Sequence, residues 1–356
     1  MNLNRRGFIL TAVLTSAPPQ SILDRQSLTM ITHQLDANNV SHLQVAETIL
    51  KEGGTVAVPT ETVYGLAADA SNPVAVAAIF AAKGRPTSHP LIVHIANVGE
   101  LENWAVDIPE QAYKLAQVFW PGPLTMLLKK ASHVSSVVTG GLDTIGVRVP
   151  SQPILQQILQ SSGLGLAAPS ANPYKRLSPT CAKQVLEALD GRINAILDGD
   201  ECTIGVESTI VDLTKEEVTV LRAGPISPSE LSLVLNQPVL APAQHFIAVP
   251  GNVADHYQPK TPFYLISRAD MLAKMRLPSE SSYFVVLADF PADESVNKLL
   301  NKILMPKSKE DFARVLYKTL HQLDGKNLKA IWFETPPQTE EWLDVNDRLV
   351  RASYSK

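Results

Sequence analysis

Residues 56–95 read VAVPTETVYGLAADASNPVAVAAIFAAKGRPTSHPLIVHI, and this stretch decides the predicted fold. It begins with a short β-forming run at 56–58 and ends with a second one at 91–95. Between them, Asn72 can cap a helix that has a proline at its first position, and Gly84 can supply the left-handed residue that stops it. A strand, a helix and another strand in this order predict an α/β domain.

The same alternation continues to residue 222, which predicts one large twisted sheet with flanking helices. Further strands are expected at 125–128, 144–149, 164–168, 195–197, 208–213 and 218–221. Further helices are expected at 109–119, 153–160, 180–189 and 228–235.

Prolines break this pattern after the first domain and indicate an extended linker. A smaller, Rossmann-like parallel α/β domain is then predicted from strands at 263–266, 283–287 and 330–333 and helices at 269–275, 293–303, 308–323 and 338–348. We therefore divide the 356 residues into an N-terminal extension (1–31), a larger domain (32–236), a linker (237–262) and a C-terminal domain (263–356).

The extension is expected to be either disordered or absent from the native protein, because Met30 opens a stretch that runs directly into the patterned domain. Its apolar run at 8–14 resembles a short secretory signal but is too short to span a bilayer, and we expect a cytoplasmic protein.

Composition limits the chemistry further. The net charge of −4 gives no general attraction to nucleic acids or anionic membranes, so any cationic site must be local. Cys181 and Cys202 form no CxxC pair, and we expect two reduced, buried thiols and no zinc site. The sequence also lacks the P-loop, GxGxxG, GxSxG and HExxH motifs, so a nucleotide site must be built in another way.

Basic residues stand where predicted elements end. Lys83 and Arg85 follow the first helix, where they could be a simple helix-end charge pair or part of a site. Arg148 shares one face of a predicted strand with Thr144, and a buried arginine needs an anionic partner, either a protein carboxylate or a ligand. With Arg222, these cations indicate a local pocket for an anionic substrate in an acidic protein.

Once these segments are assembled, the chain resembles the Sua5/YrdC/YciO family over about residues 32–352. The motifs that carry the resemblance are PTETVYGL at 59–66, KGRPxxHPLIVH at 83–94, WPGPLT at 120–125, GVRVP at 146–150, PSAN at 169–172, SPT at 178–180 and GVESTIVD at 205–212. The resemblance implies a YrdC-like mixed sheet and the two-domain Sua5 type of threonylcarbamoyl-AMP synthase. Such enzymes make threonylcarbamoyl-AMP and pyrophosphate from L-threonine, bicarbonate and ATP with Mg²⁺, for N6-threonylcarbamoyladenosine at tRNA position 37.

Site residues follow from matching positions. The resemblance implies that the phosphates and reacting groups are handled by Lys83, Arg85, Ser170 and Asn172. It implies that L-threonine is bound by Thr62, His94, Arg148, the backbone of Ala168, and Ser208. It implies that ATP is bound by Arg85, His89, Thr144, Ser170, Ser178, Arg222, His256 and Tyr257. No side chain is expected to ligate a metal.

Two segments depart from the family pattern. The linker sequence at 250–259 is similar to a family segment that folds over the pocket as a lid, with Asn252 in place of a methionine. The segment 173–177 reads PYKRL where the family often has a glycine, which leaves the contact of that loop with the ATP phosphates open.

The resemblance also implies partners: a downstream threonylcarbamoyl transferase, and weak or transient contact with tRNA. Two other functions stay open at this point. One is a YrdC-like protein that only binds RNA or nucleotide, which would release no pyrophosphate in response to threonine. The other is a related carbamoyl-adenylating enzyme of hydrogenase maturation, which is disfavoured by the absence of CxxC pairs.

Overall fold

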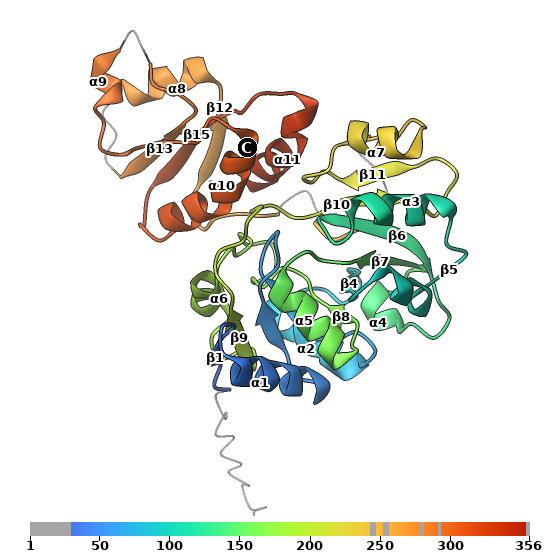
Figure 1. The fold of residues 1–356 in the computed structure, drawn as a ribbon. Coiled ribbons are helices and arrows are strands. Elements are labelled where there is room, and N and C mark those ends of the chain that lie inside the picture. The colour runs from blue at the N-terminus through green and yellow to red at the C-terminus, as the bar shows by residue number, and fades with distance from the viewer. Residues whose placement is uncertain (1–29, 243–246, 252–255, 278–280, 291–292, 354–356) are drawn as a thin grey trace, which may run out of the picture.

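The computed structural model describes residues 30–242, 247–251, 256–277, 281–290 and 293–353. Its larger sheet has the strand order β1-β9-β2-β3-β8-β4-β7-β6-β10-β11, with β5 beside β6 (Figure 1). These strands are β1 (His33–Asp36), β2 (Val56–Val58), β3 (Gly65–Asp69), β4 (Ile92–His94), β5 (Ala105–Val106), β6 (Leu124–Lys130), β7 (Thr144–Arg148), β8 (Leu166–Ala167), β9 (Ala195–Asp198), β10 (Thr209–Asp212) and β11 (Thr219–Arg222). Parallel and antiparallel pairs both occur, so the predicted mixed sheet is confirmed.

Helices lie on both faces of this sheet. They are α1 (Val40–Lys51), α2 (Pro73–Lys83), α3 (Glu110–Phe119), α4 (Ser136–Thr139), α5 (Pro153–Ser162), α6 (Ala182–Leu189) and α7 (Pro228–Leu235), with a 3₁₀ turn η1 (Val98–Asn103). Successive strand residues point to opposite faces. Val56 and Val58 therefore lie in the apolar cluster under α1 and α5, whereas Ala57 lies in the cluster under α2 and α6.

The layer formed by α1 and α5 ends near β8, and beyond it the same face of the sheet carries polar side chains. Leu166 of β8 belongs to the apolar cluster under α1 and α5, and it is paired with His94 of β4. His94 is paired in turn with Arg148 of β7. A histidine and an arginine thus continue a face that is apolar on its other half, and this change marks the place of the site.

The predicted helix caps of α2 are confirmed. The Asn72 side chain accepts hydrogen bonds from the backbone N–H groups of Val74 and Ala75 at 3.0 and 3.3 Å, and Gly84 has φ 61°. Lys83 and Arg85 consequently stand at the end of a firmly terminated helix.

The smaller sheet is parallel throughout, in the order β12-β15-β13-β14, so the predicted Rossmann-like domain is confirmed. Its elements are β12 (Phe263–Ile266), α8 (Arg268–Met275), β13 (Ser282–Val286), α9 (Glu294–Asn297), β14 (Lys302–Leu304), α10 (Lys309–Asp324), β15 (Ala330–Glu334), η2 (Glu340–Trp342) and α11 (Leu343–Ala352). The helix expected at 293–303 is wrong beyond Asn297, because β14 forms there and pairs with β13.

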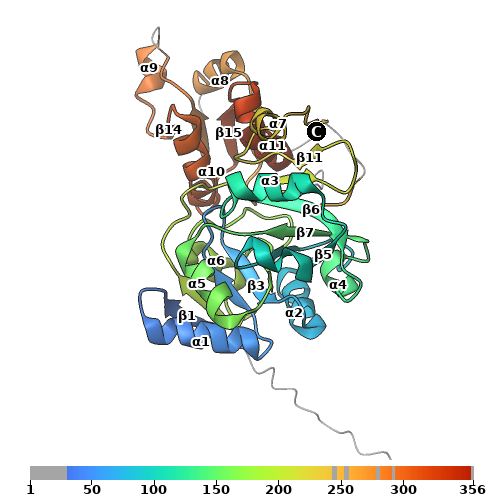
Figure 2. The ribbon, with the colours of Figure 1, turned by 45° about the vertical axis from the view of Figure 1, so that its right-hand side comes forward.

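Helices α10 and α11 face the larger sheet, as Figures 1 and 2 both show. One apolar cluster unites Val63, Val206 and Tyr257 with Phe312 and Leu316 of α10. The C-terminal domain therefore packs directly against motif segments of the larger domain.

The remaining predictions concern segments and single residues. In the described part of 237–262 no helix or strand occurs. Cys202 is buried, as expected, but Cys181 is partly exposed, and both are free thiols. Within the described ranges, no helix is long and apolar enough to cross a membrane. Residues 1–29 of the predicted extension, and Asn252 of the lid, lie outside the described residues.

Candidate active site

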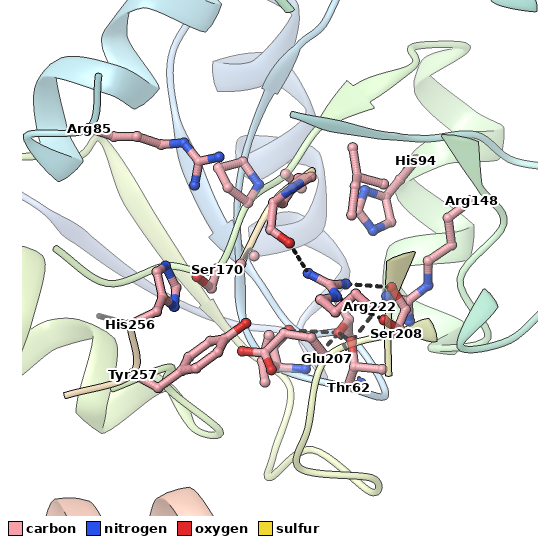
Figure 3. A pocket seen from close by; sticks show the side chains of 18 residues that line it. Thr62, Arg85, His94, Arg148, Ser170, Glu207, Ser208, Arg222, His256 and Tyr257 are labelled. Carbon is pink, nitrogen blue, oxygen red and sulfur yellow. Dashed lines mark hydrogen bonds between the residues drawn. The ribbon is translucent and has the colours of Figure 1, made fainter. Parts of the chain in front are cut away.

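A cavity opens on the polar part of the large sheet (Figure 3). The side chains that line it come from this sheet and its loops and from the linker between the two domains. Its lining comprises Thr60, Thr62, Val63, Gly65, Arg85, Ile92, His94, Arg148, Ala168, Pro169, Ser170, Glu207, Ser208, Arg222, Pro250, Gly251, His256 and Tyr257. Arg85 and Arg148 lie on opposite sides of this cavity in Figure 3, with Arg222 between them.

Arg148 is held by three groups of the protein. Its Nη2 lies 2.5 Å from Oε1 of Glu61, its Nη1 donates to the Thr62 hydroxyl at 3.1 Å, and its Nε donates to the Gly122 carbonyl at 3.1 Å. Both members of the ion pair are about 5% exposed or less. Burial opposes ionisation of Glu61, but the charge and hydrogen bond of Arg148 outweigh it and lower the pKa of that carboxyl.

This pairing bears on the two partners that the sequence leaves open for Arg148. The structure shows a protein carboxylate beside the guanidinium, and it also places the guanidinium in the cavity lining. A guanidinium has five N–H donors, and three are used here, so two remain for a ligand. Arg148 can therefore pair with Glu61 and still receive an incoming carboxylate.

His94 lies beside Arg148 and is uncharged at neutral pH. Burial and the neighbouring Arg148 charge lower the pKa of His94 to about 3. Its Nδ1 is buried and has no hydrogen-bond partner within the described part of the chain. Since buried polar atoms are normally satisfied, this nitrogen is suited to a polar group of a ligand.

The opposite side of the cavity carries cations that form no ion pair within the described residues. Arg85 is 8% exposed, donates from Nη2 to the Pro90 carbonyl at 3.0 Å, and has a buried Nε without a partner in the described residues. Burial lowers the pKa of Arg85 to about 10, so the guanidinium is still charged at neutral pH. Among the ion pairs of the described chain, none contains Arg85, Lys83 or Arg222.

Arg222 lies on the floor of the cavity and is oriented by backbone and hydroxyl groups. It donates from Nε to the Ser208 carbonyl at 3.0 Å, from Nη2 to the Ser208 hydroxyl at 2.9 Å, and from Nη1 to the Pro250 carbonyl at 3.1 Å. The Ser208 hydroxyl is also 2.8 Å from that of Thr125. A fixed, buried guanidinium of this kind is suited to an anion that brings its own charge.

His256 and Tyr257 come from the linker and close one side of the cavity (Figure 3). Burial lowers the pKa of His256 to about 3, and its Nδ1 has no partner in the described residues. The two rings meet edge to face with centroids 4.1 Å apart, and a second edge contact joins His256 to Tyr174 at 6.2 Å. The linker thus contributes a neutral imidazole and an aromatic surface to the site.

Of the residues expected at the site, ten line this cavity: Thr62, Arg85, His94, Arg148, Ala168, Ser170, Ser208, Arg222, His256 and Tyr257. Five others are absent from its lining: Lys83, His89, Thr144, Asn172 and Ser178. Thr144 begins β7 and Arg148 ends it, so the two are separated by about 13 Å along the strand.

Lys83 and Asn172 support the cavity from behind. Lys83 is 3% exposed, so of the two interpretations left open by the sequence, a simple solvated helix-end charge does not apply to it. Its ammonium donates to the carbonyl of Ser170, and to that of Asn172 at 2.6 Å. The Asn172 amide donates to the carbonyls of Pro173 and Arg176, both at 2.9 Å. Both side chains fix the loop that presents Ser170.

His89 and Ser178 lie at the edges of the same region. His89 is partly buried and meets Tyr174 edge to face at 5.4 Å, so it continues the aromatic row that includes His256. The Ser178 hydroxyl is fully buried and donates to Glu207 at 2.6 Å.

The sequence analysis missed two carboxylates, Glu61 and Glu207. Each lies inside one of the motifs, next to a predicted site residue, and each forms an ion pair with a buried arginine. For Glu61 a signal was available, because the buried Arg148 of the GVRVP motif needed an anionic partner. Which carboxylate meets which arginine depends on strand register and domain packing, which the motifs do not give.

No group of three or more His, Cys, Asp or Glu side chains that could hold a metal ion occurs in the parts of the chain that the structure describes. The cavity lining offers cations, hydroxyls, neutral imidazoles and one carboxylate, that of Glu207.

Comparison with known proteins gives two family matches. The Sua5/YciO/YrdC family model, described as "Telomere recombination", matches residues 48–224, and a model described as "Threonylcarbamoyl-AMP synthase, C-terminal domain" matches residues 226–353. A threonylcarbamoyl-AMP synthase of Pyrococcus abyssi is 37% identical over 325 residues, which are 87% of this chain and 94% of the relative. One of Bacillus subtilis is 35% identical over 333 residues, 91% and 96% of the two chains.

Among solved structures, the crystal structure of P. abyssi Sua5 complexed with L-threonine matches with a TM-score of 0.82 and 35% identity. The match covers 91% of this chain and 98% of that one, so it extends over both sheets.

Proposed function

This chain belongs to the Sua5/YrdC/YciO family, and from that membership we propose that it is a threonylcarbamoyl-AMP synthase acting in the cavity described above. The reaction joins L-threonine, bicarbonate and ATP to give threonylcarbamoyl-AMP and pyrophosphate, for the threonylcarbamoyl modification of adenosine 37 in tRNA. The observation that carries this proposal is the cavity itself, in which two buried arginines, for which the described residues provide no ion pair, lie with a third arginine that has one.

The chemistry requires three anionic species to come together. The threonine amine and bicarbonate combine to a carbamate with loss of water, and a carbamate oxygen attacks the α-phosphorus of ATP. The bond from the α-phosphorus to the bridging oxygen breaks, and pyrophosphate leaves with that electron pair. Fixed cations aimed at the charge that develops are the main means by which a protein accelerates such a step.

Threonine is placed against the wall that contains Arg148. Its carboxylate takes the two N–H donors of Arg148 that the protein leaves free, and the Thr62 hydroxyl lies 3.1 Å from the same guanidinium. The neutral imidazole of His94 accepts a hydrogen bond from the substrate's hydroxyl or amine. The Ala168 backbone and the Ser208 hydroxyl complete this side of the pocket.

ATP is placed against the opposite wall. Arg85, Arg222 and Ser170 would meet its phosphates, and the unpaired buried Nε of Arg85 supports this assignment. Lys83 would act indirectly, by donating hydrogen bonds to carbonyls of the loop that carries Ser170. Between the two walls, the carbamate oxygen and the α-phosphorus would meet near Arg222.

The lid residues His256 and Tyr257 would then exclude water from an adenylate that is prone to hydrolysis. Mg²⁺ would arrive on the ATP phosphates as part of that substrate. The cytoplasm, a downstream threonylcarbamoyl transferase and transient tRNA contact belong to this proposal as well.

The test is a product assay. Purified protein is incubated with labelled L-threonine, bicarbonate and Mg-ATP, and the labelled adenylate and pyrophosphate are measured. We expect pyrophosphate release that depends on threonine and is accompanied by equimolar adenylate. Pyrophosphate release that is indifferent to threonine, or nucleotide binding without turnover, would mean a binding protein and would refute the proposal.

A further inference from the structure

Glu207 is a carboxylate in the lining of a cavity that must accept anions. It is buried, and it neighbours Ser208 and the guanidinium of Arg222 on the cavity floor (Figure 3). A negative charge in this place would repel phosphates and compete with them for Arg222. The structure must therefore neutralise Glu207 from another side.

The neutralising cation comes from the C-terminal domain. Arg348 of α11 is 1% exposed, and its Nε donates to Oε2 of Glu207 at 2.8 Å. Its Nη1 donates to the Ala223 carbonyl at 2.8 Å, which binds the segment directly after Arg222. On the same side, the Tyr317 hydroxyl of α10 lies 3.2 Å from Oε2 of Glu207. Both helices thus reach the cavity floor through this one carboxylate.

The helices also approach the motif backbone closely. Gly205 has φ +87°, and a Cβ there would lie 2.5 Å from the Ala313 carbonyl of α10. The lid is attached on the same side, because the backbone N–H of His256 donates to the Arg351 carbonyl at 3.3 Å. The Arg348 guanidinium lies 5.4 Å from the ring centre of Tyr257.

We infer that Arg348 is a positioning residue of this active site: by pairing with Glu207 it withholds that carboxylate from Arg222, which stays available to the anionic substrate. The inference rests on the proposed function and gives the C-terminal domain a role in it. Without Arg348, Glu207 is a buried charge whose nearest remaining cation is Arg222. Arg222 then binds Glu207 and loses its hold on the ATP phosphates.

Electrostatics agree with this arrangement. Burial opposes ionisation of Glu207, but Arg348 first and Arg222 second outweigh it and lower the pKa of that carboxyl. Both cations thus act on one carboxylate, and Arg348 has the larger effect. If Arg348 is removed, the charge of Arg222 remains to stabilise the ionised carboxylate of Glu207.

The test is the Michaelis constant for ATP in threonine-dependent pyrophosphate release, measured for Arg348→Gln and for a matched control. Lys309→Met is that control, because Lys309 of α10 pairs with Asp344 of α11 at 2.7 Å, has a side chain that is only 9% exposed, and is not part of the cavity lining. We expect Arg348→Gln to raise the KM for ATP by about 10- to 100-fold, the range for a charged group left unpaired. Lys309→Met should lower the unfolding temperature and leave the KM unchanged.

Two further variants separate charge from packing. Arg348→Lys keeps the cation and should restore most of the ATP affinity. Glu207→Gln added to Arg348→Gln removes the stranded carboxylate and should also lower the KM again. If Arg348→Gln does not fold, the KM for ATP is measured instead for the double variant Glu207→Gln/Arg348→Met, because removal of both charges of a buried pair is nearly neutral for stability. This KM should lie close to the wild-type value, since no carboxylate is left to bind Arg222.

An unchanged KM in Arg348→Gln would overturn the inference, and so would a raised KM that neither Arg348→Lys nor Glu207→Gln corrects. Inactivity of the wild-type protein in the same assay would count against the proposed function instead. The two failures are therefore distinguishable.

Discussion

Two walls of the cavity differ in whether their positive charges have a carboxylate partner. The paired wall consists of Glu61, Thr62, His94 and Arg148, and its arginine has a buried carboxylate at 2.5 Å. The unpaired wall is formed by Arg85, with Lys83 behind it and Arg222 on the adjoining floor, and the described residues provide no ion pair for any of the three. A buried cation without a counter-ion destabilises the free protein. In the proposed function, the paired wall orients threonine, whereas the unpaired wall gains its counter-charge only when ATP binds.

The largest expected effect comes from the unpaired wall. Arg85→Met removes a cation directed at the phosphates, and we expect kcat/KM for ATP to fall by about 1,000-fold. The assay is threonine-dependent pyrophosphate release. Arg192→Met, which changes an exposed arginine, is the control and should keep full activity. Equal activity of the two variants would remove Arg85 from the site.

The second largest effect is on the free energy of unfolding, and it should differ between the two walls. Arg148→Met leaves Glu61 as an unpaired buried charge and should lower the free energy of unfolding by about 3–5 kcal/mol. Arg85→Met should lower it by less, about 1–3 kcal/mol, because the buried Pro90 carbonyl loses its donor but no carboxylate among the described residues is left unpaired. Urea unfolding measures both, and Glu61→Gln added to Arg148→Met should recover most of the loss. The distinction between the walls fails if both arginine variants are destabilised equally.

A smaller effect is expected for Lys83, which joins the unpaired wall without lining the cavity. Lys83→Met removes the donor of two buried carbonyls and should cost about 1–3 kcal/mol of unfolding free energy. Lys51 is the matched control, because it also ends a helix but is exposed. Lys51→Met should cost less than about 1 kcal/mol. Similar costs for the two would restore the simple helix-end interpretation of Lys83.

The smallest effect is the pH dependence of stability. His94 and His256 have pKa values of about 3 in the folded protein, below the ordinary 6.5. The folded state therefore binds fewer protons than the unfolded state between these values. Each histidine should remove about 1.4 kcal/mol of stability per pH unit as the pH falls below 6.5. Unfolding at pH 7.0 and 5.5 measures this, and His94→Gln should have a visibly shallower slope. Slopes that do not differ would mean that His94 is accessible to protons when folded.

Much of the fold is predictable from local signals. Helix α2 has its cap, its proline and its terminal glycine in sequence, and the structure keeps all three. Strand β3 was missed, because Gly-Leu-Ala-Ala-Asp contains no β-branched residue and becomes a strand only by pairing with β2 and β8. The helix expected at 293–303 failed for the same reason, since pairing with β13 outweighs the local pattern at β14.

Many of the residues that line the candidate site could be predicted from the sequence. Which side chains pair with one another could not. Resemblance to the family located ten of the lining residues, six of them within the motifs and the other four, Ala168, Arg222, His256 and Tyr257, outside them. The depth of Lys83 and the pairing of Arg148 with Glu61 or Arg348 with Glu207 depend on contacts between distant segments. Such contacts leave no periodic trace in one sequence.

Crossed titration calorimetry tests the difference between the two walls most directly. L-Threonine and a non-hydrolysable ATP analogue are each titrated into the wild-type protein, Arg148→Met and Arg85→Met. The account predicts that Arg148→Met loses threonine affinity and keeps that for the nucleotide, and that Arg85→Met shows the reverse. Equal losses of both ligands in both variants would contradict it.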